Sequence, residues 1–390
     1  MSGVTERTQG VGVGPAILTF TAFGAVQGLA LRSIGYLADD VEQPMGLIAL
    51  ALFTAAAPLA FWLTAARESR IWSAAFAVGL GGLIAGLYLL AELVFGWGYQ
   101  DSPAPFLAVG AAVIMGGISI PFFRTVFERG QSPTHYPSLF EFAWNTPVVV
   151  GVSLAFLLAF WLVLVLWGAL FRLIGVDFFQ DLFQDDWFLP IAFGAAFASA
   201  VFVVREREGV VLAVRGVLFA LLHILAPVLA FASLLFVVFL PFTGLDALWD
   251  TPSATATMLF ATAFGVVFVN AALGDGEDAA GEGLWRSVVA WSAKVQALVL
   301  PVFAGLAAYA VYLRVAQYGL AVDRILAMLF VLVASAHALV YGAFVLLPAG
   351  ADLIRRANVY LAGGLLLLAV AIQTPVLNLP ALPSSNFKYP

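Results

Sequence analysis

The sequence predicts an all-α fold, a polytopic bundle of about eleven transmembrane helices. The first observation is composition. Of the 390 residues 63% are hydrophobic and the mean hydropathy is +1.02, above the roughly half-apolar mixture of soluble domains. The second observation is a series of apolar runs of about 17 to 25 residues, long enough to cross ~30 Å of hydrocarbon as helices. The third is the absence of the ten-residue alternating segments that are typical of membrane barrels.

The apolar runs define eleven expected spans. Each must be helical, because lipid offers no hydrogen-bond partner to backbone groups. The expected spans are Gly14–Leu31, Met45–Ala65, Ile71–Phe95, Phe106–Phe123, Thr146–Phe171, Phe188–Val204, Val217–Phe242, Ala254–Leu273, Val295–Leu313, Ile325–Leu346 and Ala357–Ile372. The first run has features of a signal peptide, with Arg7 before it and small residues near its end. Its length and the following Arg32 favour a retained helix; cleavage would leave ten spans.

We expect a single integral membrane domain over residues 1–390, with a polar cytoplasmic tail at 1–13 and a proline-rich outer tail at 373–390. No polar stretch is long enough for a separate soluble domain. The net charge is −6 without a basic tract, which argues against a nucleic-acid partner. The chain has no cysteine, so disulfides, zinc–thiolate sites and cysteine nucleophiles are excluded. No metal site or other cofactor is expected from the motifs present.

The distribution of lysine and arginine predicts the orientation of the chain. Twelve of these residues lie in the N-terminal tail and the even-numbered loops. Five lie in the odd-numbered loops and the C-terminal tail, namely Arg32, Arg172, Arg314, Arg324 and Lys388. Cytoplasmic loops carry the excess of positive charge, so we expect the N-terminus inside and the C-terminus outside.

Two of the five outer cations belong to one short stretch, LRVAQYGLAVDR (Leu313–Arg324). One interpretation is structural: Arg314 extends to the interface, Gly319 ends the helix, and Arg324 begins the next one. Alternatively, Arg314, Gln317, Tyr318 and Arg324 form the mouth of a pocket for an anion or a lipid headgroup, because arginine suits carboxylate and phosphate. A third possibility pairs these arginines with acidic residues of the fifth loop.

The fifth loop, GVDFFQDLFQDDW, predicts a short amphipathic helix. Asp177, Asp181 and Asp185 share one face of such a helix, while phenylalanines occupy the other. This pattern is typical of a helix that lies in the membrane interface with its acids in water. The same carboxylates could instead collect a divalent cation.

Two histidines are expected inside the membrane, His223 in the seventh span and His337 in the tenth. Their predicted depths from the cytoplasmic face, ~9 Å and ~14 Å at 1.5 Å per residue, are compatible with a meeting. A meeting pair could relay protons or ligate a b-type haem. The alternative, which we favour, is that each histidine hydrogen-bonds across a helix interface, with Tyr341 as a candidate partner for His337.

Three segments resemble a family of bacterial polytopic membrane proteins that is catalogued as domain of unknown function 4153. The segments are LFRLIGVDFFQDLFQDDWFLP (Leu170–Pro190), LRVAQYGLAVDRILAMLF (Leu313–Phe330) and the final span after LIRRANVYLAGG. The family pattern has Thr-Pro where this chain has Ala321 and Val322, so the usual cap and first-turn proline are missing. The resemblance implies a bacterial inner membrane protein and supplies no activity or site residues.

The leading functional hypothesis is therefore a non-enzymatic permease or sensor of the bacterial cytoplasmic membrane. Its outer polar site would use Arg314, Gln317, Tyr318 and Arg324, with Asp177 and Asp181. The first alternative is a scaffold or accessory subunit that binds another membrane protein, or a second copy of itself, through the GxxxG pairs Gly24/Gly28 and Gly82/Gly86. The second is a lipid-linked transferase or a b-type haem protein; scarce intramembrane acids argue against a transferase.

Overall fold

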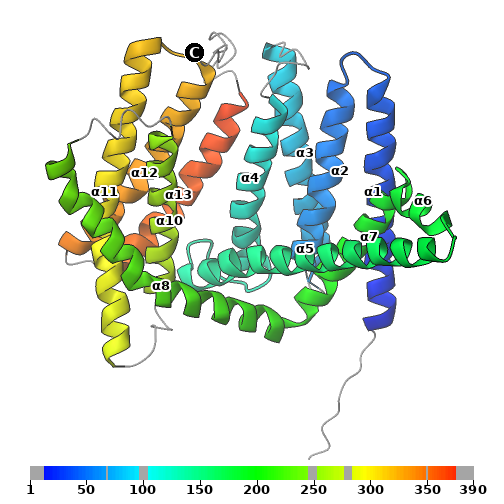
Figure 1. Ribbon diagram of the computed structural model, residues 1–390, viewed down its shortest axis with the longest axis horizontal. Helices are drawn as coiled ribbons and strands as arrows, with labels where there is room; N and C mark the ends of the chain where they lie inside the picture. Colours follow the sequence, from blue (N-terminus) through cyan, green and yellow to red (C-terminus); the bar gives the residue numbers. More distant parts are fainter. Residues whose placement is uncertain are drawn as a thin grey trace, which may run out of the picture. The chain divides into compact units, whose positions relative to one another are not determined.

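The computed structural model describes residues 13–66, 69–95, 104–244, 253–275, 283–347 and 350–374, and every regular element among them is a helix (Figure 1). The helices are α1 (Val13–Asp39), α2 (Met45–Thr64), α3 (Arg70–Phe95), α4 (Ala104–Phe127), α5 (Tyr136–Leu173), α6 (Phe178–Gln184), α7 (Phe188–Glu206), α8 (Glu208–Thr243), α10 (Ala254–Leu273), α11 (Leu284–Tyr318), α12 (Val322–Leu346) and α13 (Ala351–Ile372).

Eleven of these helices are long and apolar enough to cross a membrane, and α6 is the short exception. The predicted all-α architecture of about eleven spans is confirmed. Three helices are longer than a bilayer requires: α5 has 38 residues, α8 has 36 and α11 has 35. The helices α5, α8 and α11 begin about ten residues before the predicted spans at Thr146, Val217 and Val295. The predicted spans cover the most apolar part of each helix, and hydropathy does not mark where the helix itself starts. The N-inside, C-outside orientation stays a prediction.

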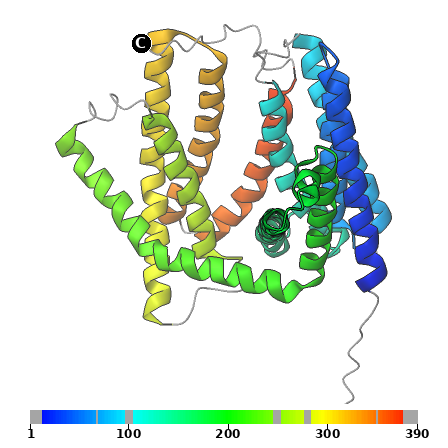
Figure 2. The ribbon, with the colours of Figure 1, turned by 45° about the vertical axis from the view of Figure 1, so that its right-hand side comes forward.

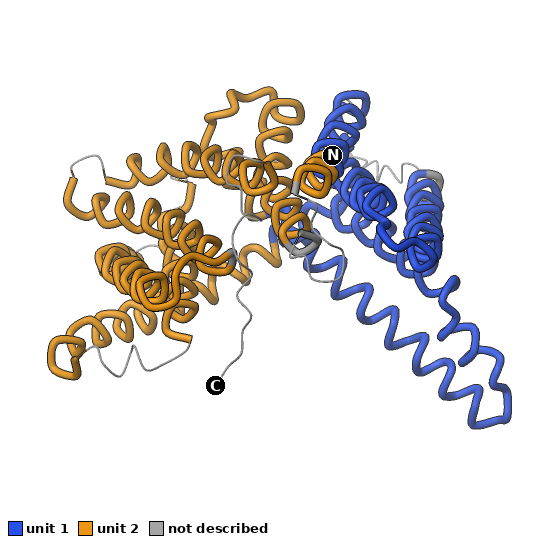
Figure 3. The backbone as a smooth tube through the Cα atoms, turned by 90° about the horizontal axis from the view of Figure 1, so that it is seen from above, with its two compact units in different colours: residues 1–85, 145–212 blue, residues 86–144, 213–390 orange. Residues whose placement is uncertain are grey.

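The chain divides into two compact units (Figure 3). Unit 1 comprises residues 1–85 and 145–212, and unit 2 comprises residues 86–144 and 213–390. The boundaries fall inside α3, α5 and α8, so the chain passes between the units within helices. The sequence predicted one integral membrane domain; both units consist of apolar helices in the part of the chain that the structure describes.

In unit 1, α1 packs against α7 at very short range. A Cβ atom added at Gly24 would overlap the backbone carbonyl oxygen of Gly194, and one added at Gly28 would overlap that of Pro190. The approach is close enough for the hydroxyls of Thr21 and Ser199 to hydrogen-bond at 2.7 Å. The Gly24/Gly28 pair therefore packs within the chain, as expected for glycines that let helices approach closely.

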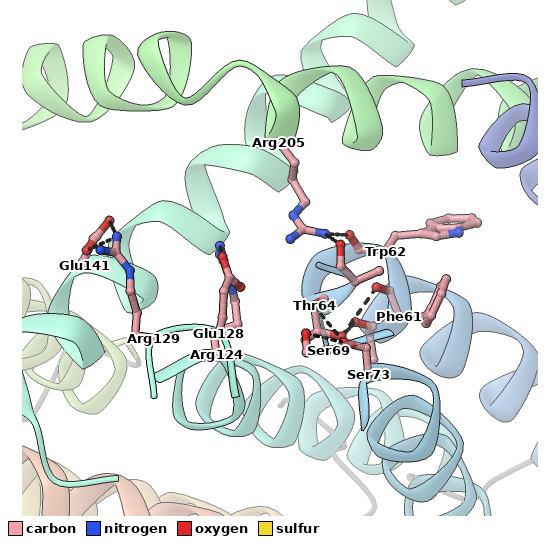
Figure 4. A network of polar contacts seen from close by, with 12 residues as sticks. Phe61, Trp62, Thr64, Ser69, Ser73, Arg124, Glu128, Arg129, Glu141 and Arg205 are labelled. Atoms are coloured by element: carbon pink, nitrogen blue, oxygen red, sulfur yellow. Dashed lines mark hydrogen bonds and ion pairs between the residues drawn. The ribbon is translucent and has the colours of Figure 1, made fainter. Parts of the chain in front are cut away.

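Polar side chains hold the helix ends of unit 1. The Arg205 guanidinium on α7 donates to the carbonyl oxygens of Trp62 and Ala65 at the end of α2 (Figure 4). These are last-turn carbonyls that have no partner in their own helix, so the arginine satisfies them and complements the helix dipole. In the same corner the Ser73 hydroxyl donates to the Thr64 carbonyl at 2.9 Å, which joins α3 to α2.

In unit 2, α11 lies side by side with α10 and α12 (Figure 2). Gly265 of α10 makes room for Leu300 of α11, and Gly342 of α12 makes room for Pro301. The packed core around these contacts contains Val269, Ala297, Leu300, Ala304, Ala338, Tyr341, Phe344 and Ile354. The core of unit 2 is thus built on α11, with a glycine on each neighbouring helix.

The corner between α4 and α5, also in unit 2, is held by paired charges. Arg124 binds Glu128 at 2.7 and 2.9 Å, and Arg129 binds Glu141 at 2.8 and 2.9 Å (Figure 4). Both guanidinium carbons lie near the buried ring of Phe142, at 4.1 and 5.6 Å from its centroid. The arrangement balances two positive and two negative charges around one aromatic ring, which favours a structural role.

The α1–α7 contact makes a first prediction. Gly24→Ala should lower the free energy of unfolding by about 1–3 kcal/mol, because the new methyl group meets backbone that cannot move aside. The measurement is the Tm of the purified protein in mild detergent. Gly35→Ala on the same helix is the control, since an added Cβ there meets no atom within 4 Å. Equal losses in the two variants would contradict the proposed contact.

Candidate functional site

The stretch Leu313–Arg324, which is predicted to lie outside, forms the junction of α11 and α12. Helix α11 ends at Tyr318, and Gly319 follows with a φ of 75°, which favours glycine. The Arg324 guanidinium donates to the carbonyl oxygens of Tyr318 at 2.8 Å and Gly319 at 2.7 Å. It also lies 5.5 Å from the centroid of the Tyr318 ring. The structure therefore brings Arg324 and Tyr318 together as a cap on the end of α11.

The other two predicted residues of this stretch do not join that cap. Arg314 and Gln317 are exposed, and within the described residues their side chains make no hydrogen bond or ion pair. The next helix starts at Val322 after an extended Ala321, without a side-chain cap. Ala321 has no side chain that could cap the helix, so the start of α12 is uncapped.

The acidic residues Asp177 and Asp181 belong to unit 1. Both are exposed, and the Asp177 carboxylate lies 3.9 Å from the Nε of Arg172. The phenylalanine face of α6 packs on α5, with ring centroids 4.4 Å apart for Phe171 and Phe179. No group of three or more candidate ligands for a metal ion occurs among the residues that the structure describes.

Arg32 of unit 1, which is predicted to lie outside, also has partners within the chain. Arg32 donates to the backbone oxygen of Asp186 at 3.1 Å and lies 5.2 Å from the Trp187 ring. Because Asp177 and Asp181 belong to one unit and Arg314 and Arg324 to the other, a site that joins them stays a prediction. Within each unit, Arg32, Arg172 and Arg324 contact neighbouring protein groups.

The two histidines both lie in unit 2 and bond to different helices. His223 Nε2 on α8 lies 3.1 Å from the Ala271 carbonyl oxygen on α10, a hydrogen bond across a helix interface. His337 Nδ1 lies 2.8 Å from the carbonyl oxygen of Val333 in its own helix. The rings of His337 and Tyr341 are 6.3 Å apart, and Tyr341 uses its hydroxyl elsewhere. One nitrogen of each ring is therefore already engaged by a carbonyl.

A polar network that sequence reasoning missed joins four helices of unit 2. We name the Tyr–Asn network by its members: Tyr136 on α5, Asn270 on α10, Tyr341 on α12 and Asn358 on α13. The Asn270 amide donates to the Tyr341 hydroxyl, which donates to the Asn358 oxygen at 2.9 Å. The Asn358 amide donates to the Asn270 oxygen at 2.7 Å and to the Tyr136 hydroxyl at 3.1 Å. The four side chains form a closed network.

The network lies near one end of the unit 2 helices. Tyr136 is the first residue of α5, and Asn270 is within one turn of the end of α10. Tyr341 is fully buried, whereas Tyr136, Asn270 and Asn358 are half-buried. The network therefore extends from the packed core toward the helix ends that lead into residues 128–135, 274–283 and 347–350.

Charged groups lie beside the network but do not enter it. Arg355 and Asp275 are near enough to act electrostatically on the Tyr136 hydroxyl. Arg355 is itself paired with Asp352 at 2.8 Å. The network thus presents two phenols and two amides without a carboxylate, an amine or an activated nucleophile. Such groups can bind a polar molecule by hydrogen bonds, whereas covalent catalysis needs an activated nucleophile and a base.

The sequence contained one signal for this network. Asn270 is an amide in a helix without charged residues, and intramembrane polar residues are functional candidates by default. Asn358 follows Arg355 and Arg356 in the first turns of α13 and stands out less. Tyr341 was singled out only as a partner of His337. The association of four residues at positions 136, 270, 341 and 358 depends on tertiary contacts that no local pattern contains.

Comparisons of the chain with protein family models, with curated proteins and with solved structures found no match. The candidate site therefore rests on the geometry of its own residues.

The cap on α11 makes a second prediction. Arg324→Ala should lower the free energy of unfolding by about 0.3–1 kcal/mol, because the last carbonyls of α11 lose a cation and two hydrogen bonds. Thermal unfolding in detergent measures the loss. Arg314→Ala, one turn before the cap, should cost less stability than Arg324→Ala, because its exposed side chain makes no hydrogen bond within the described residues. The cap is refuted if both variants behave alike.

Proposed function

We propose that the protein is a non-enzymatic permease or sensor of the bacterial cytoplasmic membrane, and that the Tyr–Asn network is its solute-recognition site. The observation that carries the proposal is a closed set of neutral hydrogen-bonding side chains from four helices, set into an apolar bundle. Membership in the family catalogued as domain of unknown function 4153 fits this proposal and remains part of it.

The chemistry of the network supports a binding role. Each member has hydrogen-bond partners within the chain, so the network contains no unpaired polar side chain. A polar solute with its own donors and acceptors can replace one of these bonds by an equivalent one, at little net cost. Because the four members belong to α5, α10, α12 and α13, such an exchange would change the contacts between helices. That coupling is what a permease or a sensor requires.

The alternatives gain less support from the geometry. Of the two GxxxG pairs, Gly24/Gly28 is occupied by α7 of the same chain and is not free for a partner protein, whereas Gly82 and Gly86 are exposed with no atom within 4 Å of an added Cβ. A haem ligated by both histidines would have to bind Nδ1 of His223 or displace the carbonyl oxygen that engages its Nε2. The outer stretch retains Arg314 and Gln317 as exposed groups, while Arg324 binds backbone oxygens.

The proposal predicts ligand-dependent stabilisation that needs the network hydroxyls. We would measure the Tm of the purified protein against a panel of neutral solutes, namely sugars, polyols, amides and zwitterionic amino acids. A ligand at 100 times its Kd stabilises the folded state by about 2.7 kcal/mol, which such a screen detects. The stabilisation should disappear in Tyr136→Phe and Tyr341→Phe, each of which removes a single hydroxyl.

Tyr360→Phe is the matched control, because Tyr360 lies on α13 and is 76% exposed. Should Tyr341→Phe fail to fold, Tyr136→Phe still decides the matter, since the other three members stay bonded to one another. Solute stabilisation that persists in both network variants would overturn the assignment of the site. No response of the wild type to any solute of the panel would overturn the proposed function.

The proposed orientation makes a separate prediction, and the absence of cysteine makes it clean to test. Gln317→Cys and Ser132→Cys each place one thiol at an exposed position. In intact cells a membrane-impermeant maleimide should label the first and not the second, because Gln317 is predicted outside and Ser132 inside. Permeabilised cells should give equal labelling. The reverse pattern would invert the topology.

A further inference from the structure

The side chain of Gln296 is buried without a partner in the middle of α11. It is 1% exposed, and both its amide nitrogen and its amide oxygen lack a hydrogen bond among the described residues. Nearly all buried polar side chains in native proteins are paired, with protein groups or with bound water. The requirement is stricter inside a membrane, where lipid supplies no partner. An unpaired amide at this depth therefore indicates a ligand.

The surroundings of Gln296 accommodate its amide. A Cβ atom on Gly265 of α10 would lie 2.6 Å from the amide nitrogen, so the glycine gives the side chain room in its observed position. Leu300 also packs against Gly265 and belongs to the apolar core of unit 2. The amide is thus held in a space that the facing helix provides and that offers it no hydrogen bond.

The same turn of α11 contains a second polar group with a missing partner. Pro301 has no N–H, so the usual helical donor to the Ala297 carbonyl oxygen is absent. Ala297 is fully buried, and its oxygen lies 3.7 Å from the position of a Cβ on Gly342 of α12. The Gln296 amide offers two N–H donors and one oxygen on the side of α11 that faces Gly265 of α10, and the Ala297 oxygen is a further acceptor on the side that faces Gly342 of α12.

We propose that this turn of α11 is a buried binding site for a small neutral molecule that offers both hydrogen-bond donors and an acceptor. Water is the smallest such molecule, with two O–H donors and free lone pairs, and the hydroxyl or amide group of a solute has the same chemistry. The ligand is neutral because the residues that line the turn, Gly265, Ala297, Leu300, Pro301 and Gly342, carry no charge to compensate an ion.

This site is separate from the Tyr–Asn network and does not rest on the proposed function. Its members are the Gln296 amide and a backbone oxygen of α11, none of which takes part in the network. Its ligand would bind beside the proline of α11, where helices bend most readily, and would hold that turn in the observed form.

The test is solid-state NMR of the wild-type protein in lipid bilayers, labelled with carbonyl-13C valine and 13C,15N glutamine. This pair of labels selects two sites, since Val–Gln occurs only at Gln27 and Gln296 in the whole sequence. Gln27 is a matched control, because its amide donates to the Thr54 carbonyl oxygen at 2.9 Å. The Gln296 side-chain amide should show a cross-peak to protons of a bound molecule, and Gln27 should not.

The proton chemical shift of that cross-peak shows whether the bound molecule is water or a solute. A cross-peak at the water frequency assigns a bound water, and one to carbon-bound protons that are not the protein's assigns a retained solute. In the second case native mass spectrometry should show an added mass that Gln296→Met loses. If the Gln296 amide has cross-peaks only to protein protons, the proposal is wrong. Because the wild type carries the measurement, the test does not depend on the variant folding.

Discussion

The whole structure depends on one constraint: hydrocarbon offers no hydrogen-bond partner. Backbone groups satisfy their hydrogen bonds by forming helices, and most described hydroxyls donate to a carbonyl oxygen of their own helix. Thr64 donates to the Ala60 carbonyl at 2.7 Å, and Ser153 and Thr262 do the same to the residues four positions earlier. Polar bonds between helices are consequently few. Some of them join helix ends or close packing contacts, and the Tyr–Asn network is the set that joins four helices.

The same constraint explains which parts of the fold could be predicted from the sequence. It acts on every span alike, so apolar length alone located eleven helices. It says nothing about where a helix continues beyond the hydrocarbon, which is why α5 begins at Tyr136 and not at Thr146. The division into two units depends on contacts such as the one between Gly24 and Gly194, and no local pattern contains a partner so distant in sequence.

The candidate site illustrates a second limit. The density of charge in Leu313–Arg324 directed attention to a helix end, where exposed carbonyl oxygens attract cations whether or not a ligand binds. Arg324 binds such oxygens. The Tyr–Asn network has no such density, since each helix contributes one neutral side chain. A cluster of charges stands out in a sequence more than a single amide does. Yet leaving a buried amide such as Gln296 without a hydrogen bond costs free energy, whereas an exposed arginine is hydrated by water.

The glycine contact between α1 and α7 also has a consequence for biosynthesis. Thr21 and Ser199, which meet across this contact, are 178 residues apart in the chain. At a synthesis rate of roughly 5–20 residues per second, α1 enters the bilayer roughly 10–35 s before α7 exists. During that interval the groove at Gly24 and Gly28 faces lipid. Helix α1 is stable in the bilayer before α7 is made, because its backbone hydrogen bonds are internal. Only the packing between α1 and α7 is delayed, so unit 1 becomes complete late in translation.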